Sequence, residues 1–244
     1  MTSILRTLGL TLAAAAAIGT AHANPTVIDF EDGLDTSFAV FAPFMTNNDA
    51  LVQGDYFVAT SSTKGGALPD DLVGLLVDGS DPSICFNVVC PSNNPTHYLA
   101  SVNDGVPWMG RLDGGTFHFV GFDSGFIAAA GITVPSTPLL LRVYGFTADN
   151  QVYFEDQLLT GPTGGLLEFS SFQMSNEFLS LRLVEVDFYG YACNTSGTCS
   201  RTLDIAQFAL DNIVVDLHEP ASLALVGLGV AAMATRRRRT ATAA

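Results

Sequence analysis

The stretch LLLRVYGFTADNQVYFE, residues 139–155, decides the fold class of this chain. It holds two runs of apolar, aromatic and β-branched residues, Leu139–Phe146 and Val152–Glu155, separated by a segment that contains Asp149 and Asn150. Short runs of this composition with turn-forming residues between them are typical of antiparallel strands. Helical periodicity is almost absent here and in the rest of the chain between its two ends.

Similar short runs, bounded by Gly, Pro, Asn and Asp, recur on both sides of this stretch. The further predicted strands are Thr26–Phe30, Tyr56–Thr60, Val73–Val77, Tyr98–Val102, Thr116–Phe122, Leu166–Phe169, Leu179–Phe188 and Phe208–Val215. About ten strands at comparable spacing favour one all-β domain over residues 24–217, a jelly-roll-like antiparallel β-sandwich. Leu179–Phe188 has apolar residues on both faces, which predicts a central strand.

Composition excludes several classes of protein. With 48% hydrophobic and 14% charged residues, the 244-residue chain is not disordered. Five of its ten basic residues are Arg6, Arg236, Arg237, Arg238 and Arg239, so residues 24–219 hold five basic against 24 acidic residues, a net charge of −19. Binding to phosphate groups requires clustered Lys and Arg, so we expect no nucleic-acid partner and no affinity for anionic lipid.

The N-terminal residues 1–23 have the pattern of a cleavable signal peptide. Met1–Arg6 is a short positive start, Leu8–Ile18 is an apolar run, and Ala21-His22-Ala23 is a site of the small-x-small type. The alternative, a buried helix, does not account for the absence of a polar face. The mature chain is therefore expected to begin at Asn24 outside the cytoplasm.

The C-terminal residues 218–244 contain a short apolar helix, residues 221–234, followed by four arginines: Arg236, Arg237, Arg238 and Arg239. Fourteen helical residues extend about 21 Å, against a bilayer core of about 30 Å, so the segment is short for a permanent anchor. The arginines would hold their end in the cytoplasm while the signal peptide sends the body outward. An ordinary C-terminal anchor is the alternative.

This tail resembles the PEP-CTERM sorting domain, also called the ice-binding protein C-terminal domain. The resemblance rests on Glu219-Pro220, the apolar helix and the arginine cluster, although His218 stands where the family usually has a proline. It implies an exosortase-type membrane protease that cuts near Glu219-Pro220 after transient anchoring in the inner membrane. The body would then reach the cell surface, outer envelope or extracellular matrix of a Gram-negative bacterium. The threonines are scattered, so the sequence predicts no ice-binding array.

The body resembles the jelly-roll sandwiches found before PEP-CTERM tails and in carbohydrate-binding modules. The similar segments are VIDFEDG (residues 27–33), GFDSGF (121–126), LLLRVYGFTADNQV (139–152) and QFALDNIVV (207–215). Gln207, Phe208 and Asp211 also match the QF-x-x-D pattern of one PEP-CTERM subgroup. In similar modules a structural calcium lies between the first and last strands.

Two kinds of stabilising site are predicted. Four cysteines allow three sets of disulfide pairings, and the simplest joins Cys85 to Cys90 and Cys193 to Cys199. Neither pair has the C-x2-C spacing of zinc sites, so disulfides are favoured over zinc binding. Asp29 and Glu31 share one face of the first strand and Asp211 lies on the last, a set of hard oxygen ligands that suits one structural calcium. The alternative is that these aspartates cap turns or lie on a solvated edge.

The sequence favours binding over catalysis. Trp108 lies in the loop-like stretch NDGVPWMGR. If its ring is exposed, it would stack on a glycan; the alternative is that the ring is buried as an anchor of the core. Glu185-Val-Asp187 begins an E-x-D-x-x-E glycosidase pattern, but Gly190 replaces the last acid. No G-x-S-x-G elbow precedes His97 or His118. We expect an exported, non-catalytic surface or matrix protein, or alternatively a lectin-like module that binds extracellular polysaccharide.

Overall fold

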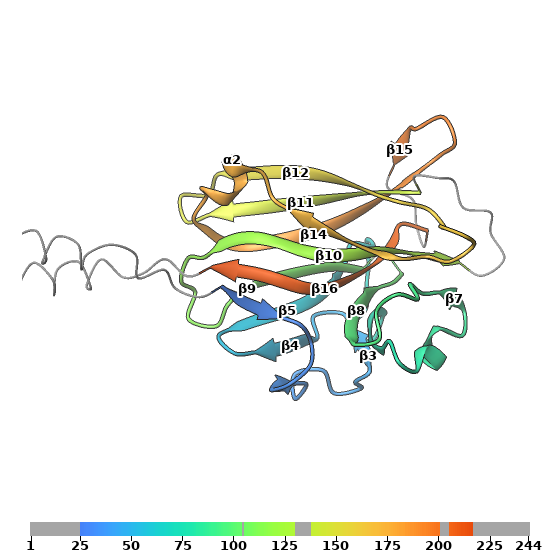
Figure 1. The fold of residues 1–244 in the computed structure, drawn as a ribbon. Helices are drawn as coiled ribbons and strands as arrows, with labels where there is room; N and C mark the ends of the chain where they lie inside the picture. The colour runs from blue at the N-terminus through green and yellow to red at the C-terminus, as the bar shows by residue number, and fades with distance from the viewer. Residues whose placement is uncertain (1–24, 104, 130–137, 201–204, 217–244) are drawn as a thin grey trace, which may run out of the picture. The chain divides into compact units, whose positions relative to one another are not determined.

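The computed structural model describes residues 25–103, 105–129, 138–200 and 205–216, and residues 25–216 form one compact unit (Figure 1). The predicted signal peptide and the predicted sorting tail lie outside the described residues. The tail residues concerned are Glu219, Pro220, Arg236, Arg237, Arg238 and Arg239. Within the described ranges, no helix has the length and apolar character needed to cross a bilayer.

Two antiparallel sheets form the body, which confirms the predicted all-β sandwich. The first sheet has the order β13 (Phe169–Gln173), β10 (His118–Ala129), β16 (Gln207–Asp216), β8 (His97–Ser101), β6 (Leu72–Asp78) and β3 (Phe44–Thr46). In addition, β1 (Thr26–Ile28) pairs with β16 and β7 (Val88–Val89) pairs with β10. The last strand of the body therefore lies inside the first sheet.

The second sheet has the order β12 (Val152–Leu159), β11 (Leu139–Thr147), β14 (Leu183–Cys193), β9 (Gly105–Arg111), β5 (Tyr56–Ser62), β4 (Ala50–Gln53) and β2 (Leu34–Asp35). A short β15 (Cys199–Ser200) pairs with β14. The described helices are the 3-10 turn η1 (Pro82–Cys85) and the short α2 (Asn176–Leu179). As predicted, β14 is central, between β11 and β9.

The core lies between the sheets because apolar side chains alternate along the strands. On β11, Leu141 and Val143 are fully buried, and Phe188 on β14 is as well. Phe188 packs against Phe119 and Phe122 of β10, with ring centroids 5.8 Å and 5.4 Å apart, so the contact joins the two sheets. Each such buried side chain contributes about 1.5–3 kcal/mol to folding.

Three strand predictions need correction. Gly105–Arg111, predicted as a loop, is the paired strand β9. Pro107 is tolerated in this strand because the ladder with β14 spans only Trp108–Gly110, so Pro107 does not need to donate an N–H to β14. The strand predicted from Leu179 begins at Leu183, because the Ser175 hydroxyl caps α2 by accepting from the Phe178 N–H. The strand predicted at residues 166–169 lies later, at β13.

Both predicted local disulfides are present, Cys85–Cys90 and Cys193–Cys199. The first joins the end of η1 to the segment after β7, and the second joins β14 to β15 at a directly opposed pair. Each closes a short loop, so each restricts the unfolded chain only modestly.

Candidate functional site

The outer face of the second sheet gathers aromatic side chains from five neighbouring strands. Directly paired residues of an antiparallel sheet point to the same side, and the opposite side of this sheet is the buried core. The register places seven rings together on the outer side, which we call the aromatic face: Phe57, Trp108, Tyr144, Phe146, Phe154, Tyr189 and Tyr191. The sequence alone indicated only Trp108 among these seven rings.

Two rows of directly opposed residues cross the aromatic face. One row is Phe154, Tyr144, Asp187 and Trp108, on β12, β11, β14 and β9. The next is Phe146, Glu185, Gly110 and Phe57, on β11, β14, β9 and β5. Asp187 therefore has an aromatic neighbour on each side, and Glu185 has Phe146 on one side and Gly110 on the other.

The rings support one another. Phe57 and Trp108 meet edge to face, with centroids 4.9 Å apart and planes at 80°. The ring of Tyr144 lies 5.3 Å from that of Tyr189 and 6.0 Å from that of Phe154. These are favourable aromatic geometries, so the rings are held in place before any ligand arrives.

Trp108 is half-buried on β9, and its indole Nε1 donates a hydrogen bond to the Ser61 hydroxyl at 3.1 Å. The side chain is thus neither the exposed loop platform nor the fully buried anchor that the sequence suggested. It lies at one side of the aromatic face with a fixed orientation. Phe154 is the most exposed ring of the aromatic face, with 57% of its surface exposed.

Asp187 and Glu185 form an interacting carboxyl pair on this face. Burial raises the pKa of Asp187 to about 7, helped by the charge of Glu185 and a hydrogen bond with it. The Oδ1 atom of Asp187 is buried and has no hydrogen-bond partner among the described residues. The pair therefore carries unused hydrogen-bonding capacity and holds a proton readily near neutral pH.

The guanidinium of Arg142 on this face is already paired. Arg142 donates to both carboxylate oxygens of Asp156, at 2.6 and 2.8 Å, and these bonds raise its pKa. The guanidinium also stacks 4.2 Å from the centroid of Phe154. Its charge therefore stabilises the edge strand β12 rather than the carboxyl pair.

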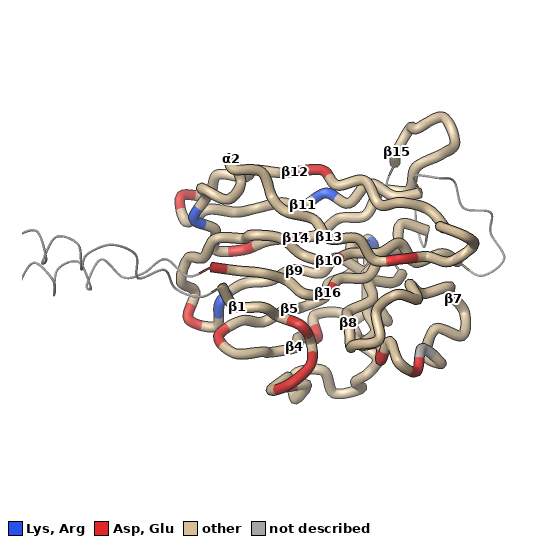
Figure 2. Tube along the Cα trace, viewed as in Figure 1, with Lys and Arg blue, Asp and Glu red and all other residues tan. Residues whose placement is uncertain are grey.

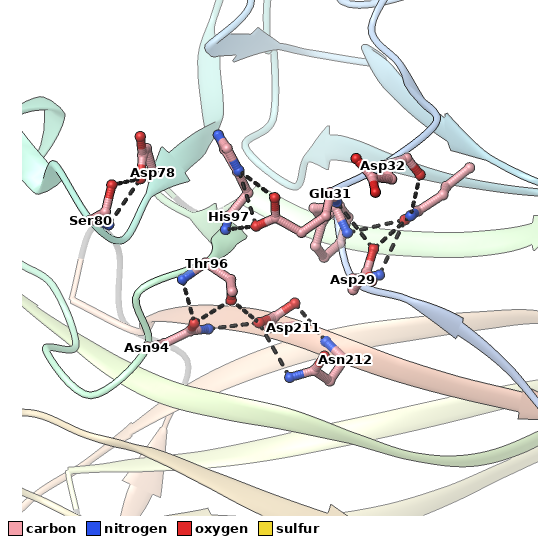
Figure 3. Close-up of polar contacts among 12 residues, drawn as sticks. Asp29, Glu31, Asp32, Asp78, Ser80, Asn94, Thr96, His97, Asp211 and Asn212 are labelled. Carbon is pink, nitrogen blue, oxygen red and sulfur yellow. Dashed lines mark hydrogen bonds and ion pairs between the residues drawn. The ribbon is translucent and has the colours of Figure 1, made fainter.

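The three residues predicted to bind calcium belong to two separate groups of hydrogen-bonded residues, one around Asp211 and one around Asp29 and Glu31 (Figure 3). Asp211 on β16 is fully buried and accepts hydrogen bonds from the Asn94 Nδ2 at 2.6 Å and the Asn212 backbone N–H at 2.7 Å. Burial raises the pKa of Asp211 to about 6, although these donors oppose the shift. Thr96 adds a longer hydroxyl bond at 3.3 Å.

The other two predicted calcium ligands have different partners. Asp29 accepts a hydrogen bond from the Gln53 Nε2 at 2.6 Å, which links the segment after β1 to the second sheet. Glu31 accepts from the His97 backbone N–H and contacts the His97 Nδ1 at 3.1 Å (Figure 3). The described chain gathers no group of three acidic, histidine or cysteine side chains suited to a metal, so Asp29, Glu31 and Asp211 do not form a ready-made site. Calcium binding stays a prediction.

Comparison with known proteins identifies the tail. Residues 219–239 match the PEP-CTERM protein-sorting motif. The match includes Glu219 and Pro220 as well as Arg236, Arg237, Arg238 and Arg239, so the resemblance of the tail is confirmed. This motif indicates an exported protein that an exosortase sorts to the cell envelope, typically in Gram-negative bacteria. No curated protein matches the chain.

The solved structures to which the chain is similar share little sequence with it. A DUF4465 family protein from Bacteroides caccae is 12% identical, with a TM-score of 0.45, over 80% of this chain and all of its own. The module TmCBM61, solved with β-1,4-galactotriose, is 11% identical, with a TM-score of 0.34, over 66% of this chain and 88% of its own. The CBM22 tandem domain of Paenibacillus barcinonensis Xyn10C is 10% identical, with a TM-score of 0.31, over 83% of this chain and 50% of its own.

Proposed function

We propose that this protein binds extracellular polysaccharide through the aromatic face, after the PEP-CTERM tail has delivered it to the cell surface or matrix. The observation that carries the proposal is the pair of rows in which Trp108, Tyr144 and Phe146 flank the Asp187 and Glu185 carboxyl groups. Sugars present C–H faces that stack on aromatic rings and hydroxyls that donate to carboxylates. The aromatic face offers both on one rigid sheet.

The proposal includes no catalysis. Glycoside hydrolysis needs two carboxyl groups with separate roles as acid and as base or nucleophile, whereas Asp187 and Glu185 lie two residues apart on the same side of one strand. Gly190, which replaces the third acid of the glycosidase pattern, pairs with buried Leu141 and belongs to the inner side of the sheet. The pair is better suited to holding a sugar than to cleaving it.

Tail removal is the second part of the proposal. Exosortase cleavage near Glu219-Pro220 would free the body from the membrane and discard the four terminal arginines. Mass spectrometry of the mature protein from cells that make the polysaccharide should find neither these arginines nor the first 23 residues. Mature protein that still carries Arg236, Arg237, Arg238 and Arg239 would show that the tail is a lasting anchor.

Glycan binding is tested with the mature exported protein on a panel of bacterial polysaccharides. Phe154→Ala removes an exposed ring of the aromatic face, and Phe41→Ala removes a 65% exposed ring in the loop before β3. We expect Phe154→Ala to weaken retention on the bound polysaccharide and Phe41→Ala to leave it unchanged. Retention on no polysaccharide would favour a purely structural role in the matrix.

A further inference from the structure

We propose that the aromatic face prefers saccharides that carry a protonated amino group, held between Glu185 and Asp187 and flanked by Trp108 and Tyr144. This inference rests on the proposed glycan-binding function and names the class of sugar. It follows from the charge balance of the face, the placement of the rings and the hydrogen-bonding capacity of the carboxyl pair.

The aromatic face has an excess of negative charge. On the outer side of the strands that carry the rings, Arg142 and Asp156 neutralise each other through two hydrogen bonds. Glu185 and Asp187 remain. Burial is the main cause that raises the Asp187 pKa, and the charge of Glu185 raises it further. Basic residues are few along the whole described chain, whereas acidic ones are spread over it (Figure 2). The aromatic face would therefore repel uronic acids and attract a cation.

The rings favour the same ligand class. Trp108 and Tyr144 are the two cross-strand neighbours of Asp187, one on each side. Side chains at such positions have Cβ atoms about 4.5–5.5 Å apart, so both aromatic residues are direct neighbours of Asp187. Aromatic rings attract cations, and the attraction is stronger at partly desolvated positions such as this one.

Hydrogen bonding distinguishes an amine from a hydroxyl. An ammonium group has three donors and no acceptor, so it can bond both carboxylates at once and relieve their mutual repulsion. A neutral hydroxyl donates only once and leaves that repulsion in place.

The test compares three short β-1,4-linked oligosaccharides of equal length by calorimetry: a glucosamine oligomer, its N-acetylated form and a glucose oligomer. The protein is the mature exported form, at about 0.15 M salt so that distant charges are screened. We expect the glucosamine oligomer to bind at least tenfold more tightly than either neutral oligomer. In Glu185→Gln/Asp187→Asn, the ratio of these affinities should fall to about one, with an unfolding temperature that shows the variant is folded.

A charge-matched control excludes simple attraction to an acidic protein. Asp55→Asn/Asp70→Asn removes two exposed carboxylates outside the aromatic face, so the tenfold preference should persist. A preference lost equally in both double variants would overturn the inference. Equal affinity of the native protein for all three oligosaccharides would overturn it as well, while leaving the proposed glycan-binding function intact. Binding to none of these three and to no polysaccharide of the panel would contradict the proposed function itself.

Discussion

Asp187 on β14 lies directly opposite Trp108 on β9, in the register of an antiparallel pair. Because both residues belong to paired strands, the backbone ladder fixes the spacing between their Cα atoms. A site built on strands is held more firmly than a site built on loops. The relationship therefore makes the centre of the aromatic face a preorganised surface for a ligand with both polar and apolar edges.

Trp108 should contribute to binding through its ring rather than through its indole N–H. Trp108→Phe keeps an aromatic surface but loses the hydrogen bond to Ser61, whereas Trp108→Ala loses both. We expect Trp108→Ala to weaken polysaccharide binding by about tenfold or more and Trp108→Phe by about threefold or less. Calorimetry with the bound polysaccharide measures both. Equal losses in the two variants would assign the effect to the Ser61 contact.

Stability should fall as pH rises from about 4 to 7. The pKa values of Asp187 and Asp211, about 7 and about 6, are higher than those of an unfolded aspartate, about 4. The folded protein therefore binds more protons than the unfolded chain in this range, and its free energy of unfolding decreases across it. We expect the melting temperature to be at least about 2–4 °C higher at pH 5 than at pH 8.

The variant Asp187→Asn isolates the contribution of this group. It cannot ionise, so the part of the decline between about pH 6 and 8 should largely disappear. The carboxylates with lowered pKa values, such as Asp78 and Asp113, lose their contribution only in strong acid and do not affect this comparison. A native melting temperature that rises from pH 5 to pH 8 would contradict the assignment.

Asp211 should be important for stability. It is fully buried and accepts hydrogen bonds from Asn94 and Asn212, so Asp211→Ala leaves buried donors without partners and opens a cavity. We expect a loss of about 2–4 kcal/mol in the free energy of unfolding, measured by denaturant titration. Asp70→Asn, at an exposed loop position, should change it by less than about 0.5 kcal/mol. Similar values for the two variants would show that the hydrogen bonds to Asp211 are dispensable.

Calcium binding is a separate test of the same region. Coordination by Asp29, Glu31 and Asp211 requires these side chains to exchange Gln53, His97 and Asn94 for the ion. If the sequence-based prediction holds, calcium raises the melting temperature of chelator-treated protein, and the rise disappears in Asp211→Asn. An unchanged melting temperature in excess calcium removes the site and leaves hydrogen bonding as the role of the three carboxylates.

The sequence predicts the fold better than the site. Strands with clear β-branched and aromatic runs, such as β5, β6 and β11, lie within two residues of their predicted positions. The strand β9 was missed because Pro107 and two glycines hide its pattern, and its pairing with β5 and β14 overrides that local composition. The tail was predictable because its signals are contiguous.

The aromatic face was not predictable because strand register is absent from a single sequence. Trp108, Tyr144 and Asp187 are separated by more than 30 residues in each step, and only the pairing of β9, β14 and β11 places them in one row. A signal was nevertheless present: aromatic residues recur at every second position in Tyr144-Gly-Phe146 and in Tyr189-Gly-Tyr191. Such a pattern indicates that the outer side of the strand also carries apolar side chains suited to contact with a ligand.

The position of β16 bears on how the body matures. These last ten residues lie between β10 and β8 and also pair with β1, so the first sheet has a gap until they are in place. If the chain crosses the inner membrane with its N-terminus first, β10 and β8 lack their shared partner strand until Asp216 has crossed. Until then the first sheet has unpaired strand edges, which tend to associate with other chains. The sorting motif begins only three positions later, at residue 219. Completion of the first sheet and exposure of the motif to its protease would therefore be nearly simultaneous. This order favours the release of molecules whose first sheet is already complete.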